Sequence, residues 1–128
     1  KTIGLEVRAD ESVILRAPAV DEISDVEWKS ILGEFTERVN HFCKVMDVTV
    51  GRITIRNQKT RWGSCSSKGN VNFNYQLYYM PRELMDYVII HELSHRRHMN
   101  HSAEFWQEVE KYCKTYRECR KKLRDYEI

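Results

Sequence analysis

The chain has 128 residues, of which 41% are hydrophobic and 31% are charged, values typical of one globular domain spanning residues 1–128. Its formal net charge of +2 is too small to indicate nucleic-acid binding by itself, and no apolar run approaches the ~20 residues of a membrane span. Residues 1–4 carry no export signal, so we expect a cytoplasmic protein, and the missing initiator Met predicts further residues before Lys1.

The first predicted elements are two short strands. Residues 2–8 alternate between apolar and polar side chains, which is typical of a half-buried strand. Residues 10–12 form a turn, and residues 13–16 continue as a second strand. The pair is therefore predicted to be a β-hairpin.

A long amphipathic helix follows. Ser24-x-x-Glu27 has the form of a capping box, which marks a helix start. Apolar residues then recur at steps of three and four over about five to six turns, as on the buried face of a helix. This stripe consists of Trp28, Ile31, Leu32, Phe35, Val39, Phe42, Cys43 and Met46. The pattern predicts a core-facing helix without a cofactor role.

Two more strands flank a polar loop. Ile53 and Ile55 alternate with polar residues in one strand, residues 70–75 alternate in the other, and residues 57–69 form the loop between them. The second strand has an asparagine at every other position. Its edge is a candidate for binding an extended substrate, and the alternative is that its Asn face is solvated.

Three helices complete the predicted fold. Pro81 suits the first turn of a helix, where its missing N–H costs nothing, and this helix is predicted to run to about Arg97. A second helix begins near Ser102, and a basic terminal helix spans about residues 115–124.

The cysteines indicate no metal site of their own. Cys43, Cys65, Cys113 and Cys119 form no Cys-x-x-Cys pair, which argues against a zinc knuckle. We expect four separate, reduced thiols, as is usual in cytoplasmic proteins.

The helix after Pro81 carries a metal-binding pattern, His91-Glu92-x-x-His95. Val88 precedes the first histidine by three residues, so both imidazoles continue the inward-facing apolar stripe. Residues four apart lie about 5–6 Å apart at Cβ, which lets two ring nitrogens bind one metal ion at about 2.0–2.1 Å. Glu92 flanks the same cleft, where it can take a proton from metal-bound water without being a ligand. Coincidental histidines and a non-catalytic metal site are the simpler alternatives, and Glu92 argues against both.

A third ligand is needed, because a catalytic zinc usually has three protein ligands and one open position. The candidates are His98 and His101. On an unbroken helix His98 would lie about 10.5 Å along the axis from His91, too far to share one ion. The chain must therefore turn after His95, and Met99-Asn100 is a plausible turn because Asn tolerates left-handed backbone. His101 is therefore favoured over His98 as the third metal ligand.

Two segments resemble the YgjP-like metallopeptidase family of bacteria and archaea. One is QKTRWGSCS at residues 58–66, and the other runs from HELSH at residues 91–95 through NHSAEFW at residues 100–106. The resemblance is strong over about residues 50–113. The family is related to the WLM and SprT-like zincins, which share the bent metal-binding segment. Its members usually carry a longer segment than residues 17–23 between the hairpin and the long helix.

The resemblance implies a zincin-like α+β fold, in which a small, mostly antiparallel sheet packs on the long helix and on the HExxH helix. It also implies zinc bound by His91, His95 and His101, with Glu92 as general base. The metzincins share this histidine spacing but need Gly where this chain has His98, which argues against them. Nickel or cobalt would suit the same ligands.

The expected chemistry is hydrolysis by a zinc-activated water, whose proton Glu92 accepts and later returns to the leaving group. An electrophilic helper for the developing negative charge is also expected. Arg61 is the first candidate, with His98 and Asn100 behind it. The alternative for Arg61 is a solvated side chain in a turn beside a packed Trp62.

Three functions compete at the level of sequence. A metallopeptidase that cleaves peptide bonds leads, mainly through the resemblance. A nucleoside triphosphate pyrophosphohydrolase with the same metal site is an alternative, favoured slightly by Lys59, Arg61 and Lys68 on one loop. A DNA-associated metalloprotease module is another, suggested by the WLM and SprT-like kinship and the basic terminal helix, for which a solvated face is the simpler explanation. The basic residues of that helix are Lys114, Arg117, Arg120, Lys121, Lys122 and Arg124.

Overall fold

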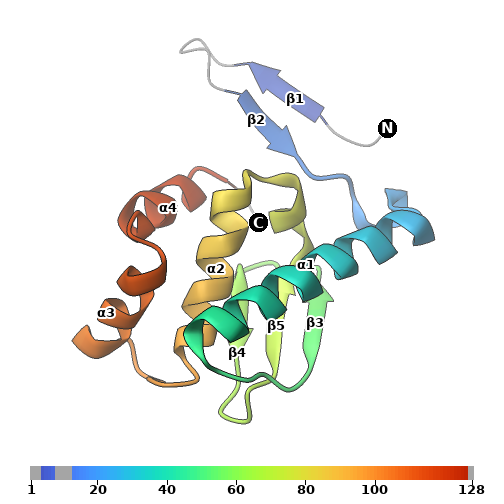
Figure 1. Ribbon diagram of the computed structural model, residues 1–128. Helices are drawn as coiled ribbons and strands as arrows, with labels where there is room; N and C mark the ends of the chain where they lie inside the picture. Colours follow the sequence, from blue (N-terminus) through green and yellow to red (C-terminus); the bar gives the residue numbers. More distant parts are fainter. Residues whose placement is uncertain (1–3, 8–12, 127–128) are drawn as a thin grey trace.

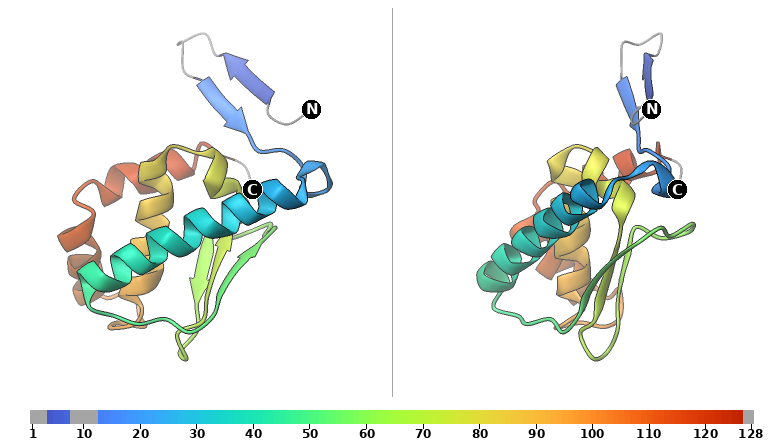
Figure 2. Two further views of the ribbon diagram at one scale, coloured as in Figure 1. Left: turned by 45° about the vertical axis from the view of Figure 1, so that its right-hand side comes forward. Right: turned by 90° about the vertical axis from the view of Figure 1, so that its right-hand side faces the viewer.

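The computed structural model describes residues 4–7 and 13–126, with side chains from residue 17 onward. In chain order the elements are β1 (Gly4–Val7), β2 (Val13–Arg16), the 3-10 helix η1 (Val20–Glu22), α1 (Asp25–Met46), β3 (Ile53–Arg56), β4 (Gly63–Cys65), β5 (Val71–Asn74), the 3-10 helix η2 (Tyr75–Tyr79), α2 (Arg82–Ser94), α3 (Ala103–Tyr112) and α4 (Tyr116–Leu123). Helices α1 and α2 lie on one face of the sheet formed by β3, β4 and β5, and α3 and α4 pack against α2 (Figures 1 and 2).

The predicted hairpin is confirmed. β1 and β2 pair antiparallel, with Leu5 opposite Leu15. Figure 1 shows this pair standing apart from the sheet and the four helices. The turn predicted at residues 10–12 lies outside the described residues.

The three-stranded sheet has the order β3-β5-β4, with β3 parallel and β4 antiparallel to β5, so it is mixed. The sequence missed β4, because Gly63-Ser64-Cys65 lacks the alternation that marks a strand and lies in the predicted polar loop. The prediction that the edge of residues 70–75 binds substrate is wrong, because β5 is the central strand and both of its edges are paired. Tyr75 begins η2 instead of ending the strand.

The Asn face of β5 is buried at Asn74 and half-buried at Asn72, and both side chains are hydrogen-bonded. Asn74 is fully buried, and its Nδ2 donates to the carbonyls of Gln58 and Arg61. Asn72 Nδ2 donates to Ser64 Oγ on β4. These amides tie the loop before β4 to the central strand, because a buried amide is stable only when its donors have partners.

Helix α1 supplies one wall of the core. Ser24 caps its start by accepting a hydrogen bond from the Glu27 amide, as predicted, but the Glu27 carboxylate accepts from the Tyr79 hydroxyl. Most of the predicted stripe is buried, and Phe35 stacks on Phe73 of β5 with ring centroids 5.6 Å apart. Leu32 is an exception, because it lies at the margin of the stripe and is 48% exposed.

Helix α2 lies between α1, the sheet and the two last helices. Leu84, Val88 and Leu93 are buried along it, and Asp86 accepts two hydrogen bonds from Arg38 of α1, at 3.0 and 2.8 Å. Pro81 is the residue before the first turn, and the helix ends at Ser94, three residues earlier than predicted. The early end matters because it falls inside the metal-binding pattern.

Two further expectations concern the described residues. The four cysteines are free thiols, as expected. Among the helices of residues 17–126, none combines the length and apolar character needed to cross a bilayer.

Replacing Phe35 with Ala is expected to lower the free energy of unfolding by about 3–5 kcal/mol, because a fully buried ring leaves a cavity against Phe73. Leu32→Ala, on the same helix, is the matched control and should cost less than ~1 kcal/mol because that side chain is half exposed. Urea unfolding followed by circular dichroism measures both. Equal losses in the two variants would contradict this assignment of the buried face.

Candidate metal centre and active site

The structure brings three imidazoles together at the end of α2. One ring nitrogen from each of His91, His95 and His101 lies within 4.8 Å of the others, and the two Nε2 atoms of His91 and His101 are 3.3 Å apart. His91 lies in the last turn of α2, His95 is the C-cap residue directly after that helix, and His101 lies in the segment that leads into α3. This is the grouping that the spacing predicts, and it is close enough for one divalent metal ion to be bound by all three residues.

Hydrogen bonds orient the rings of the half-buried His91 and the buried His95. His95 Nδ1 lies 3.0 Å from the carbonyl oxygen of His98, and a carbonyl can only accept, so Nδ1 carries the proton and Nε2 is unprotonated, the form that a metal ion requires. His91 Nδ1 lies 3.3 Å from the hydroxyl of Tyr87, which accepts a hydrogen bond when Nδ1 carries the proton. In that tautomer His91 also presents an unprotonated Nε2.

The electrostatics of the cluster favour neutral imidazoles. Burial lowers the pKa of His91 to about 3, with further lowering by His95, His101 and Arg120. Burial also lowers the pKa of His95. Neutral histidines near pH 7 bind a cation without first losing a proton.

Aromatic side chains from α3 hold the imidazoles in place. Phe105 stacks on His95 with ring centroids 4.5 Å apart, and Trp106 stacks on His101 at 6.0 Å. Phe105 is fully buried. Ser102 caps α3 by accepting from the Phe105 amide, so the start of this helix is defined directly after His101.

The chain leaves α2 through a tight turn. The amides of His95, Arg96 and Arg97 each bond to the carbonyl three residues earlier, which is 3-10 geometry. The chain bends at Met99 and Asn100, as predicted, but the left-handed conformation expected of Asn100 is wrong, because in residues 17–126 Asp47 and Gly69 are the residues with positive φ. The helix thus tightens and stops by itself, and no left-handed residue is needed.

Two arginines of this turn anchor it to the rest of the fold. Arg96 Nε donates to the Thr49 carbonyl at 2.8 Å. Arg97 donates to the carbonyls of Met46 and Asp47, at the end of α1, at 3.0 and 2.8 Å. His98 contributes its carbonyl to His95 and is not part of the imidazole cluster.

Glu92 lies beside the cluster and is 6% exposed. Burial raises the pKa of its carboxyl to about 8, and the charge of Arg61 opposes that rise. Strand β4 approaches very closely here, since a Cβ added at Gly63 would lie 3.1 Å from Glu92 Cγ. Glycine at this position therefore leaves room for the carboxylate against the strand.

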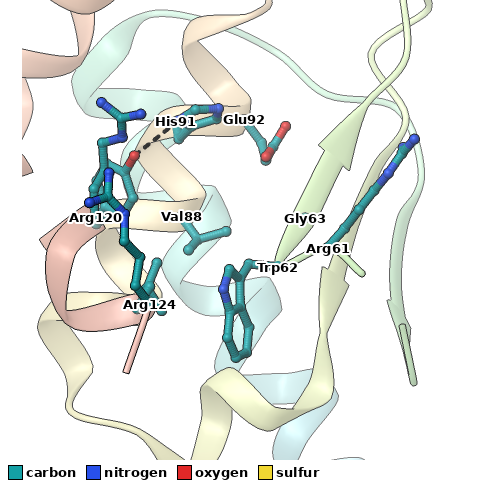
Figure 3. Close-up of a pocket in the computed structure, with 10 residues that line it drawn as sticks. Arg61, Trp62, Gly63, Val88, His91, Glu92, Arg120 and Arg124 are labelled. Carbon is teal, nitrogen blue, oxygen red and sulfur yellow. Dashed lines mark hydrogen bonds between the residues drawn. The ribbon is translucent and has the colours of Figure 1, made fainter. Parts of the chain in front are cut away.

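Arg61, the predicted electrophilic helper, is exposed but lines the same cavity as His91 and Glu92. In Figure 3 its side chain extends away from the Glu92 carboxylate. Trp62, next to it, is half-buried and lines the cavity, and Asn100 is exposed.

Tyr87 is a site residue that sequence reasoning missed. It lies four residues before His91, one helical turn away, and is buried. It was not among the predicted site residues, because a tyrosine on an apolar helix face carries no metal-binding signal by itself. The spacing itself was the available signal, because a hydroxyl four residues from a histidine can reach its ring.

Comparisons with known proteins agree with this geometry. The family described as "YgjP-like, metallopeptidase domain" matches residues 19–126. The chain is also similar to the crystal structure of the metallopeptidase zymogen of Pyrococcus abyssi abylysin, with 25% identity, a TM-score of 0.63, and coverage of 70% of this chain and 90% of that chain. A second similar structure, the metallopeptidase zymogen of Methanocaldococcus jannaschii jannalysin, has 23% identity, a TM-score of 0.63, and coverage of 71% and 94%, and supports the fold alone. No curated protein matches the sequence. The resemblance seen in the sequence and the α+β zincin-like fold are thereby confirmed.

Replacing Tyr87 with Phe removes the hydroxyl that faces His91 Nδ1 and is expected to weaken zinc binding by about 10-fold, since partners of this kind orient a metal-binding imidazole. Competition with a chromophoric chelator measures the affinity. Tyr78→Phe removes a hydroxyl from η2 and serves as the control, with no expected change. An unaltered affinity in the Tyr87 variant would show that the hydroxyl does not orient the ring.

Proposed function

The chain belongs to the YgjP-like metallopeptidase family, and we propose that it cleaves peptide bonds with a zinc ion held by His91, His95 and His101. The observation that carries the proposal is the convergence of three imidazole nitrogens within 4.8 Å beside a buried carboxylate. Three protein ligands with a further position open for substrate or water are typical of catalytic zinc.

The donor set fits zinc. All three donors are imidazoles, and a partner at Nδ1 of the half-buried His91 and of the buried His95 leaves Nε2 available to bind. When bound, zinc polarises a carbonyl and makes a water molecule nucleophilic near neutral pH. The rest of the chemistry falls to residues of the chain.

We assign proton transfer to Glu92. Its carboxylate lies in the cavity beside His91, is shielded from water, and has a pKa raised toward neutrality, which suits a group that takes up a proton and gives it back. In peptide hydrolysis it would receive the proton of the attacking water and return it to the leaving amine. Arg61 is the proposed electrostatic helper, because its charge lowers the pKa of the Glu92 carboxyl against the rise caused by burial.

Strand β4 is the proposed guide for the peptide. It is an edge strand, it packs against α2, and Gly63 brings its backbone next to Glu92. An extended peptide that pairs with this edge would pass the carboxylate. The edge role predicted for residues 70–75 is therefore proposed for residues 63–65 instead.

Neither alternative function gains support. The family and the similar structures are metallopeptidases, which points to peptide rather than nucleotide or nucleic acid as substrate. Part of the basic charge of α4 is neutralised within the molecule, because Lys122 pairs with Glu83 at 2.7 Å and Arg117 with Glu110 at 3.9 Å. A phosphate-binding function for this helix is therefore not proposed.

His101→Ala is expected to weaken zinc binding by more than the ~10–100-fold that loss of an orienting partner costs, because it removes a direct ligand. His98→Ala is the matched control and should bind zinc as the wild type does, since its side chain lies outside the cluster. Metal content after dialysis and a competitive zinc titration measure the zinc affinity of both variants and of the wild type. If His98→Ala weakened zinc binding and His101→Ala did not, His98 would be the third ligand instead of His101.

Glu92→Gln is expected to lower peptide hydrolysis by about 10²–10⁴-fold while zinc content is unchanged, because the amide cannot accept the proton. Zinc-loaded wild type and variant are offered casein and UTP in parallel. Casein turnover that disappears in the variant supports the proposal. Casein turnover that persists rules out Glu92 as the base, and turnover of UTP alone rules out a peptidase.

A further inference from the structure

A cavity of about 340 Å³ opens beside His91 and Glu92, which is within the size range of small-ligand sites. It lies between α2, α4 and the start of β4 (Figure 3). Its walls are apolar where Trp62, Val88 and Leu123 contribute. Because it adjoins the proposed reaction centre, a group bound in it would belong to a residue next to the bond that is cleaved.

Arg120 of α4 and Arg124, directly after that helix, give this cavity a positive end. Arg120 and Arg124 are one helical turn apart, and both line the cavity. In Figure 3 they extend from α4 toward the side of the cavity on which His91 lies. Arg120 is also held in place, because its guanidinium lies over the Trp106 ring, 4.6 Å from the centroid.

These two charges have no counter-ion in the part of the chain that the structure describes. Within residues 17–126, no carboxylate lies within ion-pair distance of Arg120 or Arg124, whereas Lys122 on the same helix pairs with Glu83 at 2.7 Å. Like charges four residues apart on a helix repel each other, which costs stability. An anion in the cavity would relieve that repulsion and bind through charge-assisted hydrogen bonds.

We propose that this cavity is a substrate subsite in which Arg120 and Arg124 bind a carboxylate of the peptide beside the cleaved bond. The proposal rests on the proposed peptidase function and names its substrate class. The apolar walls suit the aliphatic stem of an amino acid, and the arginines suit the carboxylate at its end. Such a carboxylate is the side chain of Asp or Glu, or the C-terminal group of the peptide.

The first test measures binding without turnover. Zinc-loaded full-length chain is titrated with three small ligands: N-acetylglutamate α-amide, which has a side-chain carboxylate, N-acetylleucine, which has a terminal carboxylate, and N-acetylglutamine amide, which has neither. The NMR signal of the Trp62 indole N–H reports on the cavity, and that of Trp28, which packs on Tyr75, is the internal reference. We expect one of the two carboxylates to bind at least ~10-fold more tightly than the neutral amide.

Variants separate the arginines from the metal, because a carboxylate can also bind zinc. The double variant Arg120→Gln/Arg124→Gln should lose the ~10-fold preference. Lys121→Gln, which removes an equal charge per site from the same helix, should keep it. A wild type without carboxylate preference, or a preference that survives in the double variant, would overturn the subsite.

A cleavage test distinguishes this proposal from the peptidase function. A defined set of synthetic peptides, made with Glu or Gln at each position and with free or amidated C-termini, is digested and analysed by mass spectrometry. The subsite predicts cleavage next to Glu over Gln, or next to a free over an amidated C-terminus, with kcat/KM for the preferred peptide ~10-fold lower in the double variant and nearly unchanged for its neutral partner. Arginine-dependent binding without cleavage of any peptide would overturn the peptidase and leave the subsite standing. Cleavage without an arginine-dependent preference would overturn the subsite and leave the peptidase function standing.

Discussion

Three imidazoles can meet at one point only if the helix that carries the first of them ends at the second, which here is the C-cap residue His95. Along a continued helix the third ring would move away by about 1.5 Å per residue and rotate to another face. In this structure α2 ends at Ser94, its final turn tightens to 3-10 geometry, and the chain then brings His101 back against His91. The positions of α3 and of the end of α1 can both be understood from this requirement.

The end of α1 supports the turn after α2 through backbone carbonyls that have no hydrogen-bond partner within the helix. The last carbonyls of a helix have no partner within the helix, so they are available to donors from elsewhere. Arg97 uses those of Met46 and Asp47, and Arg96 reaches the next segment at Thr49. The long helix is thus required for more than its apolar face, because its terminus holds the segment that carries the third histidine.

Features set by local spacing were predictable from the sequence. The stripe of α1, the start of α3 at Ser102 and the grouping of His91, His95 and His101 each depend on residues close together in the chain. β4 was not predictable, because a Gly-Ser-Cys strand has no periodic signal and is defined by pairing with a distant partner, Val71–Asn74. Leu32 was misassigned because a stripe predicts the centre of a buried face better than its margins.

Polar residues at the site were the hardest to assign from sequence. The alternating asparagines of β5 looked solvated, yet Asn74 is fully buried because it bonds to two loop carbonyls. The basic terminal helix looked like one uniform surface. In the structure its charges differ in role, since Lys122 pairs with an acidic residue while Arg120 stacks on Trp106 at the cavity. Only tertiary contacts reveal such differences.

The hydrogen bonds between Arg97 and the end of α1 couple two processes that involve distant parts of the chain. One is fraying of the last turn of α1, and the other is metal binding by the histidines beyond α2. Helix ends fray, and Asp47, with its left-handed backbone at φ 55°, closes the last turn of α1. When that turn opens, Arg97 loses its acceptors, and the segment between His95 and His101 loses its support. An ion bound by these histidines would therefore suppress fraying at α1, so that amide exchange in this remote turn becomes a measure of metal occupancy.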